Sequence, residues 1–282
     1  MRLASYETGD AQGYGVINAD DMIIPLGDGP GAPASVAAWL AGGFGEGDVA
    51  GFAGEPVSLS EVRLLPPIPA PGKIFCVATN FHEPSRQGKP APDYPLLFTR
   101  YPDTLVGHGQ PLCKPPTSSR FDFEGEVAVV IGKAGFQIPP AEAMAHVGGY
   151  ACFNDGSVRD WQKHSSQFTP GKNFVRSGSF GPWLVTADAV AAPSGLTLET
   201  RVNGVLKQAI GLDRFIFDIP WLIAYISTFS PLAPGDVIAT GTPSGFGSTR
   251  EPPEFLQAGD IIEVAVPGIG TLSNPVREGY DI

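Results

Sequence analysis

Glycine and proline interrupt this chain so often that long helices are excluded from most of it. The 282 residues include 36 glycines and 29 prolines, without a collagen-like period. Proline removes a backbone donor and glycine weakens helices and strands, so the apolar runs between them are short. Because 43% of the residues are hydrophobic and only 17% are charged, these runs can still bury a core. The pattern predicts an α+β protein, built mainly from β-strands and ordered turns.

A proline-rich segment divides the chain into two predicted domains. Residues 64–73 (LLPPIPAPGK) cannot lie inside a helix or a central strand, so we expect an extended linker there. Residues 1–66 combine short apolar runs, Gly/Asp turns and one brief helix around 35–44, which is typical of a small β-rich domain. Residues 67–282 hold most of the predicted strands and form the second domain.

Three segments of the second domain carry strong local signals. Residues 123–133 (FEGEVAVVIGK) are apolar on both faces, as a central buried strand should be. The Asn203–Gly204 pair predicts a tight hairpin turn. Residues 218–228 form the strongest predicted helix, with Asp218 as its cap and Pro220 in its first turn. Residues 81–95 are polar and proline-dense, which indicates a long exposed loop.

Charge and cysteine content exclude several classes of partner. A net charge of −11 repels phosphate backbones and anionic lipid, so we expect neither nucleic acid nor a membrane as a partner. The chain has three widely spaced cysteines in apolar surroundings, Cys76, Cys113 and Cys152, and no two of them form a CxxC motif. This predicts buried reduced thiols and no structural zinc site. Together with the lack of an apolar leader or membrane-length segment, this predicts a cytoplasmic protein.

Two glutamates at the start of the strongest strand form the first chemical signal. Glu124 and Glu126 are two residues apart, so in a strand they share a face at about 7 Å. Buried there, two carboxylates need a neutralising cation, whereas at a solvated strand end they are simply hydrated. Asp155, which lies where a predicted strand gives way to a helix, adds a third carboxylate or is only a turn residue. The pair alone does not decide between these alternatives.

A short predicted helix after Asp155 supplies groups that would complement such a site. Arg159 and Gln162 lie four and seven residues after Asp155. If VRDWQ is helical, these two side chains share one face of the helix with the residues at its start. Carboxylates beside a guanidinium and an amide suit a hard divalent cation together with an anionic substrate. The residues therefore indicate a site for a small anionic acid held by a metal ion.

In several stretches the sequence resembles the fumarylacetoacetate hydrolase family. The matching stretches occur in family order over most of residues 73–282, and they include KIFCVATNF, FDFEGEVAVVIGK, GYACFNDGSVRDWQ, FTPGKNFVRSGSFGPWLVT and PGDVIATGTPSGFG. The resemblance implies that the second domain is a rolled mixed β-sheet with the small N-terminal domain appended. It also implies a homodimer.

The resemblance assigns roles to individual residues. It implies that Mg²⁺ or Mn²⁺ is held by Glu124, Glu126 and Asp155, with Lys172 as a catalytic lysine. It implies substrate contacts from Arg159, Gln162 and Thr242, and from Arg100, which stands where relatives often carry lysine. The predicted lid departs from the family pattern, because Asn80–Phe81 is followed at once by His82–Glu83 in place of spaced residues. His82 is then the nearby candidate for the catalytic base, with Glu83 as its partner.

These residues predict a reaction as well as a site. The expected activity is metal-dependent hydrolysis of a C–C bond in a 1,3-dicarbonyl acid of the acylpyruvate or fumarylpyruvate kind, in the catabolism of aromatic compounds. The substrate would be a small anionic 2-oxo acid. The same site could instead serve decarboxylation, isomerisation or hydration of a 2-oxo acid, or a relative that binds such acids without turnover.

Overall fold

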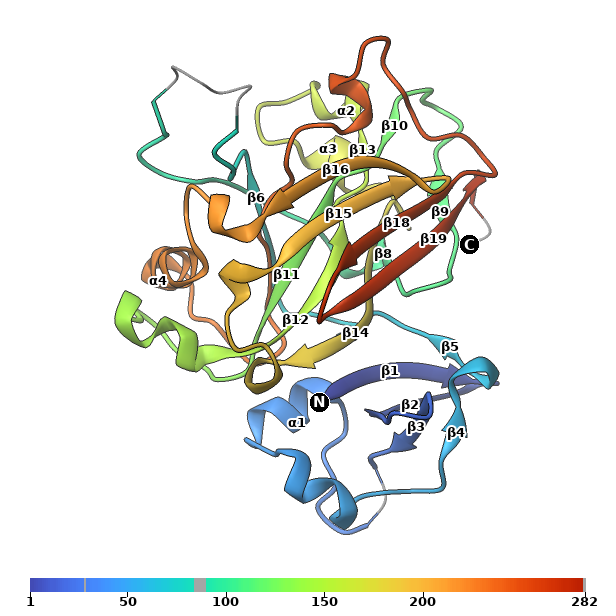
Figure 1. Cartoon of the computed structure of the whole chain (residues 1–282), viewed down its shortest axis with the longest axis vertical. Helices are drawn as coiled ribbons and strands as arrows, with labels where there is room; N and C mark the ends of the chain where they lie inside the picture. Colours follow the sequence, from blue (N-terminus) through green and yellow to red (C-terminus); the bar gives the residue numbers. More distant parts are fainter. Residues whose placement is uncertain (28, 84–89, 281–282) are drawn as a thin grey trace.

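The computed structural model describes residues 1–27, 29–83 and 90–280, and strands dominate it (Figure 1). The strands are β1 (Arg2–Thr8), β2 (Ala11–Ile17), β3 (Met22–Pro25), β4 (Val57–Ser58), β5 (Arg63–Leu64), β6 (Ile74–Ala78), β7 (Leu96–Thr99), β8 (Leu105–Val106), β9 (Leu112–Lys114), β10 (Phe121–Asp122), β11 (Gly125–Ile131), β12 (Val147–Asn154), β13 (Ser157–Val158), β14 (Gly178–Thr186), β15 (Thr197–Val202), β16 (Val205–Gly211), β17 (Val237–Ala239), β18 (Ile261–Val266) and β19 (Gly270–Glu278).

Helices are few and mostly short. The α-helices are α1 (Val36–Ala41), α2 (Arg159–Gln162), α3 (Thr169–Lys172) and α4 (Ile219–Phe229). Short 3₁₀ helices occur at Glu46–Gly51, Leu59–Glu61, Pro102–Thr104, Pro140–His146, Ala187–Ala189, Pro193–Gly195, Leu212–Arg214 and Gly247–Thr249. The α+β, mainly β prediction is therefore confirmed.

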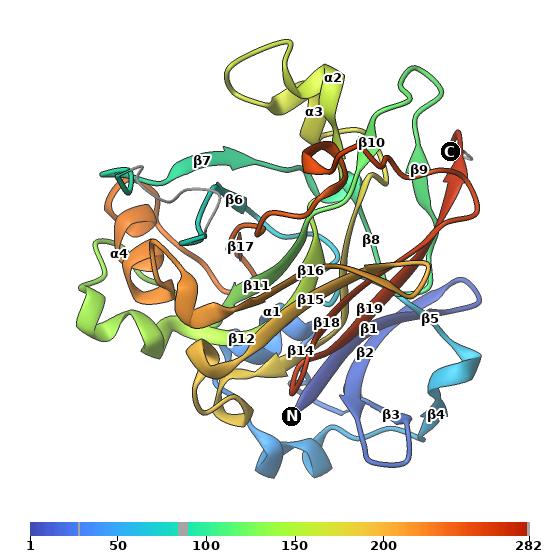
Figure 2. The same cartoon turned by 45° about the horizontal axis from the view of Figure 1, so that its top comes forward.

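Two mixed sheets form the body of the molecule. The larger has the order β4-β3-β2-β1-β14-β12-β11-β17-β6-β7, with β5 and β8 added beside β1 and β14. The smaller has the order β16-β15-β18-β19-β9, and β10 pairs separately with β13. Figure 2 shows β15, β16, β18 and β19 lying across β11, β12 and β14, and the two sheets are in contact there. The core lies between these layers.

The central strand β11 shows why the sheets stack. All seven of its residues are buried. Val127, Val129 and Ile131 face the smaller sheet and α4, whereas Ala128 and Val130 face the cluster that contains Trp39 of α1. Successive side chains in a strand point to opposite faces, so an unbroken apolar run is stable only when both faces are covered. The predicted central strand is confirmed.

The other strong local predictions are also confirmed. Asn203 and Gly204 join β15 to β16, and both have positive φ (52° and 76°), as a type I′ turn requires. The side chain of Asp218 caps α4 by accepting from the Trp221 N–H at 2.9 Å. All three cysteines are free and buried. Of the predicted loop 81–95, residues 84–89 lie outside the described residues.

The N-terminal segment continues the larger sheet. β1 pairs antiparallel with β14, where Arg2 lies opposite Val185 and Leu3 opposite Leu184. Leu3, Tyr14 and Trp39 belong to the same apolar cluster as Ala128 and Val130 of β11. Figure 1 shows the N-terminal strands and α1 at one end of the molecule. Within the described part of the chain, no helix is long and apolar enough to cross a membrane.

Candidate active site

The start of β11 and the end of β12 bring distant acidic residues to one edge of the sheet. Gly125 lies opposite Asn154 in the antiparallel pair, so Glu124 and Asp155 flank the same position. The Asp155 N–H donates to the Glu124 carbonyl at 2.8 Å, and the Glu124 N–H donates to the Asn154 side-chain oxygen at 3.0 Å. Strand register therefore fixes residues about thirty positions apart as neighbours.

Glu124, Glu126 and Asp155 converge in the interior. Their carboxylate oxygens, one from each residue, all lie within 4.8 Å of one another. The residues are 7%, 1% and 0% exposed, so all three carboxylates are removed from water. This excludes the alternative in which the two glutamates are hydrated at a strand end.

Three buried cations compensate two of these carboxylates. Lys172 Nζ lies 2.6 Å from Glu124 Oε2 and 2.5 Å from Asp155 Oδ2. Arg100 Nη1 lies 2.6 Å from Asp155 Oδ1, and Arg159 Nη1 lies 2.6 Å from Glu124 Oε1. Burial alone would raise the pKa of Asp155, but Lys172 and Arg100 hold that pKa below its usual value. Asp155 is therefore fixed as an anion.

Glu126 has a different environment. It accepts a hydrogen bond from the Gly241 N–H at 2.9 Å, and it forms no ion pair with any residue that the structure describes. Burial raises the pKa of Glu126 well above its usual value, and the charges of Asp155 and Glu124 raise it further. A buried carboxylate of this kind ionises only if a positive charge is supplied.

The donor set fits a hard divalent cation. Three carboxylates supply oxygen ligands, which Mg²⁺ and Mn²⁺ prefer, and leave positions open for water or substrate oxygens. Such an ion would supply the positive charge that Glu126 lacks. The buried triad can thus hold a metal ion, and Glu124, Glu126 and Asp155 are the residues that would hold it.

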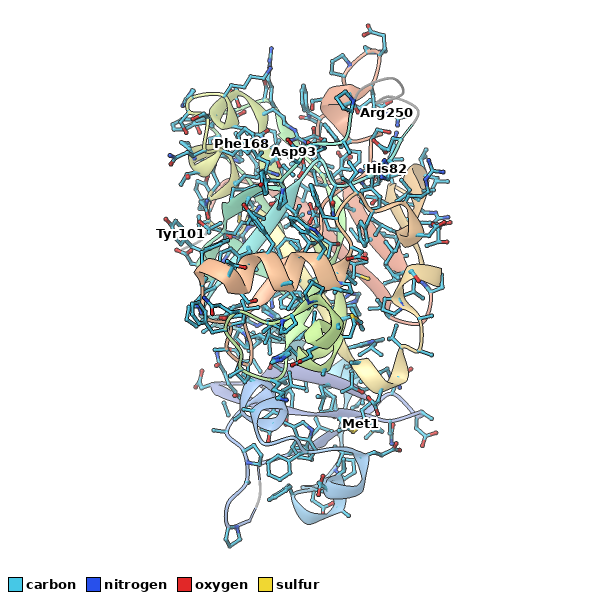
Figure 3. All side chains as sticks on the ribbon, turned by 90° about the vertical axis from the view of Figure 1, so that its left-hand side faces the viewer. Met1, His82, Asp93, Tyr101, Phe168 and Arg250 are labelled. Carbon is cyan, nitrogen blue, oxygen red and sulfur yellow. The ribbon has the colours of Figure 1, made fainter. Side chains whose placement is uncertain are left out.

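A cleft of about 950 Å³ opens onto the triad. Glu124 and Glu126 form part of its inner wall. Further lining residues include Glu83, Arg159, Gln162, Lys172 and Thr242. Figure 3 shows His82, Phe168 and Arg250 at this end of the molecule, far from Met1. The cleft thus combines an acidic interior with polar and cationic walls.

Two predicted residues lie outside the cleft. Arg100 was expected to contact substrate, but it is only 2% exposed and is bonded behind Asp155, to Gly156 O and to the Ser177 hydroxyl. Each nitrogen of its guanidinium donates to the protein, with Nε bonded to the Thr104 hydroxyl, so the side chain is placed to position Asp155. His82 is exposed and does not line the cleft, and its backbone is bonded to Arg214.

Thr242, Gln162 and Glu83 line the cleft, and they differ in how far their polar atoms are already hydrogen-bonded. The Thr242 hydroxyl donates to the Gly125 carbonyl at 2.9 Å and accepts from Gln208 at 2.9 Å, so it is largely engaged. Gln162 accepts from Arg159 Nη1 at 3.1 Å, which leaves its amide nitrogen for a ligand. Glu83 Oε1 accepts from the Ser244 N–H at 2.6 Å, which ties residues 81–83 to the glycine-rich loop 241–247.

Sequence reasoning missed Asp122. This fully buried carboxylate accepts from Arg159 Nε at 2.7 Å and from the Gly247 and Ser248 N–H groups at 2.7 and 2.8 Å. It fixes the guanidinium of Arg159 and the loop above it in one arrangement. A signal was present, because Asp122, Glu124 and Glu126 alternate in DFEGE, and alternate positions of an extended chain share a face.

Comparison with known proteins agrees with the fold. The family described as "Fumarylacetoacetate (FAA) hydrolase C-terminal" matches residues 73–277, and "Rv2993c-like, N-terminal" matches residues 1–67. The chain therefore belongs to the fumarylacetoacetate hydrolase family. It is 44% identical over 224 residues to oxaloacetate tautomerase YisK of Bacillus subtilis, which covers 78% of this chain and 74% of that protein.

Solved structures extend the comparison to the whole chain. A fumarylacetoacetate hydrolase from Exiguobacterium antarcticum is 33% identical with a TM-score of 0.88, over 99% of this chain and 100% of that one. A maleylpyruvate hydrolase from Sphingobium sp. SYK-6, solved with manganese(II) and pyruvate, is 29% identical with a TM-score of 0.79, over 99% and 100%. The predicted family is confirmed. The Bacillus subtilis relative is named for tautomerisation, so membership of the family alone does not imply hydrolysis.

Proposed function

We propose that this protein is a metal-dependent tautomerase that interconverts the enol and keto forms of a small 2-oxo acid, with oxaloacetate as the candidate substrate. The observation that carries the proposal is a buried carboxylate triad opening into a cleft that none of the chain's four histidines lines. All four histidines belong to the described residues. Tautomerisation needs one group to move a proton, whereas hydrolysis also needs a base that activates water. The name of the Bacillus subtilis relative supports this choice.

The residues of the cleft would have separate roles in the reaction. A divalent ion held by Glu124, Glu126 and Asp155 would polarise the 2-oxo acid and make its C3 protons more acidic. Arg159 Nη2 is buried without a hydrogen-bond partner among the described residues, so it is available to the substrate carboxylate. The Lys172 ammonium would stabilise negative charge as it develops on the substrate oxygen.

Glu83 is our candidate for proton transfer at C3. In the enol-to-keto direction the enol oxygen loses a proton and C3 gains one, and the reverse holds for enolisation. The Glu83 carboxylate lines the cleft and is oriented by its bond to the Ser244 N–H. A carboxylate held in this way can accept and return a proton without a second catalytic group. This assignment replaces His82 as the base.

The decisive experiment follows the ultraviolet absorbance of enol oxaloacetate. With Mg²⁺ or Mn²⁺ the protein should accelerate loss of the enol, and a chelator should abolish the acceleration. Glu83→Gln should lower kcat on the order of 100-fold. Glu55→Gln, which removes an exposed carboxylate outside the cleft, should not. Enol loss at the uncatalysed rate with either ion would refute the proposal.

C–C bond hydrolysis of an acylpyruvate is the second candidate. It is favoured by the cleft volume of about 950 Å³, which exceeds the needs of a four-carbon acid, and by the hydrolase names of the structural relatives. Product analysis by NMR separates the candidates. Two fragments indicate hydrolysis, release of CO₂ indicates decarboxylation, and an unchanged carbon skeleton indicates tautomerisation or hydration.

A further inference from the structure

The charges around the triad suit only one end of a substrate. The buried cluster contains four carboxylates and three cations, namely Asp122, Glu124, Glu126 and Asp155 with Arg100, Arg159 and Lys172. A divalent ion would turn its net charge from minus one to plus one, which a single carboxylate neutralises. A second carboxylate on the same substrate would find no unmatched charge there. In a protein of net charge −11 it needs cations further out.

Two cations at the mouth of the cleft are available for this purpose. Arg120 and Lys163 both line the cleft and are exposed, and neither forms a hydrogen bond or ion pair through its side chain with the part of the chain that the structure describes. Arg250, which also lines the cleft, is held 3.0 Å from Glu254 and is therefore neutralised. Arg120 and Lys163 thus differ from the cleft's other cations in having no acidic partner among the residues that the structure describes.

Backbone contacts put both residues beside the inner site. The Arg120 carbonyl accepts from the Arg159 N–H at 3.0 Å, so Arg120 lies next to the start of α2. Lys163 follows Gln162 directly and is the C-terminal cap of α2. Figures 1 and 2 both show β10, which Arg120 precedes, next to α2. The two side chains therefore extend the wall that Arg159 and Gln162 begin.

The acids at the mouth belong to other segments. Glu83, Glu251 and Glu254 line the cleft from residues 81–83 and 250–254. Figure 3 places His82 and Arg250 on one side of this end of the molecule and Phe168, which precedes α3, on the other. The mouth is therefore basic beside α2 and acidic beside the glycine-rich loop.

We propose that Arg120, assisted by Lys163, forms an outer anion subsite for the second carboxylate of a 2-oxo dicarboxylate. The inference rests on the proposed function, and it makes the enzyme selective for dianionic acids over 2-oxo acids with one carboxylate. Arginine suits the task because its planar guanidinium can bind both oxygens of a carboxylate at once. Lys163 adds charge without that geometry.

A pair of nearly isosteric substrates tests the subsite. Oxaloacetate and acetylpyruvate share the 2-oxo acid end and an acidic CH₂ group, but acetylpyruvate has an acetyl group in place of the second carboxylate. Arg120→Gln should raise KM for oxaloacetate about tenfold, the effect of losing one charge-assisted contact, with kcat little changed. KM for acetylpyruvate should stay within twofold. Arg120→Lys should raise KM for oxaloacetate less than Arg120→Gln does. The Arg120→Gln/Lys163→Gln double variant should raise it more than either single variant.

The controls separate the subsite from general charge and from the proposed function. Arg63→Gln makes the same change in net charge at an exposed residue outside this cleft, so it should leave both KM values unchanged. Calorimetric titration of the Mg²⁺-loaded protein with both acids gives the same comparison without turnover. Inactivity of the parent protein would refute tautomerisation alone. Equal weakening of both acids by Arg120→Gln, or no weakening of either, would overturn the subsite.

Discussion

Glu126 differs from the other two triad members at the scale of single residues, because it forms no ion pair with any described residue. Glu124 and Asp155 are paired with Lys172, Arg159 and Arg100, and the cations beside Asp155 hold its pKa below its usual value. Glu126 accepts from the Gly241 N–H, and burial and two neighbouring carboxylates raise its pKa more than the charge of Lys172 lowers it. Metal binding and the ionisation of Glu126 are consequently expected to depend on each other.

We therefore predict that Glu126→Gln separates folding from metal binding. The amide keeps the shape and can still accept from Gly241, so the variant should fold with wild-type stability or better. Its affinity for Mn²⁺, measured by calorimetry, should fall on the order of 100-fold, and metal-dependent activity with it. In the wild type, free Mn²⁺ at a hundred times its Kd should add about 2.7 kcal/mol of stability. A variant that still binds Mn²⁺ at wild-type affinity would contradict the ligand assignment.

Arg100 illustrates a residue whose role depends on partners far away in the chain. It donates to Asp155, Gly156 and Ser177, and all of these contacts are buried. We predict that Arg100→Met lowers the free energy of unfolding by roughly 3–5 kcal/mol, because it leaves Asp155 with a weaker set of cations. Ser177→Ala, which removes one hydroxyl partner, should cost only about 0.5–1.5 kcal/mol. Urea denaturation measures both, and equal stability of Arg100→Met and wild type would disprove the positioning role.

At the scale of elements, the packing of α2 against α3 positions Gln162 and Lys172. Gly171 makes this contact possible, since a Cβ there would lie 2.4 Å from the Gln162 backbone. We predict that Gly171→Ala forces the two helices apart, costs about 1–3 kcal/mol of stability and lowers activity on the order of 100-fold. Gly195→Ala provides the control, because Gly195 has open space around it and no positive φ. Unaltered kcat in Gly171→Ala would show that this spacing is not critical.

The elements also show what a sequence can reveal. β11, α4 and the hairpin at Asn203–Gly204 follow from local patterns, and the acidic triad follows from strand alternation and motif resemblance. The role of Arg100 does not, because it depends on contacts with residues 55 and 77 positions away. His82 and Glu83 are adjacent in sequence but differ in exposure, since backbone bonds to Arg214 turn His82 outward. Such outcomes are decided by tertiary packing.

At the scale of the whole molecule, the pairing of β1 with β14 joins the N-terminal segment to the sheet that carries the triad. The predicted domain boundary at residues 66–67 therefore does not coincide with a break in the sheet. Trp39 is fully buried in a cluster that also contains residues of β11 and β12. The homodimer and the two-domain division remain predictions.

We predict that the two parts unfold together. In urea, pulse hydrogen exchange should show amides of β2 and β3 losing protection at the same denaturant concentration as amides of β11 and β12, because one apolar cluster spans both. Leu3→Ala, in the shared cluster, should shift the loss of protection in both sets of amides to the same lower urea concentration. Two separate transitions would mean that residues 1–66 form an independent domain.

The site has an inner part made by paired strands and an outer part made by loops and short helices. Changes in the strands disturb the core of the protein, whereas changes at the rim affect only what enters. New substrate preferences are thus expected to arise by exchange of rim residues while the carboxylate triad is preserved, which would explain how one scaffold can carry relatives named for different reactions. A library randomised at Arg120 and Lys163 alone would be a compact starting point for selecting new acids.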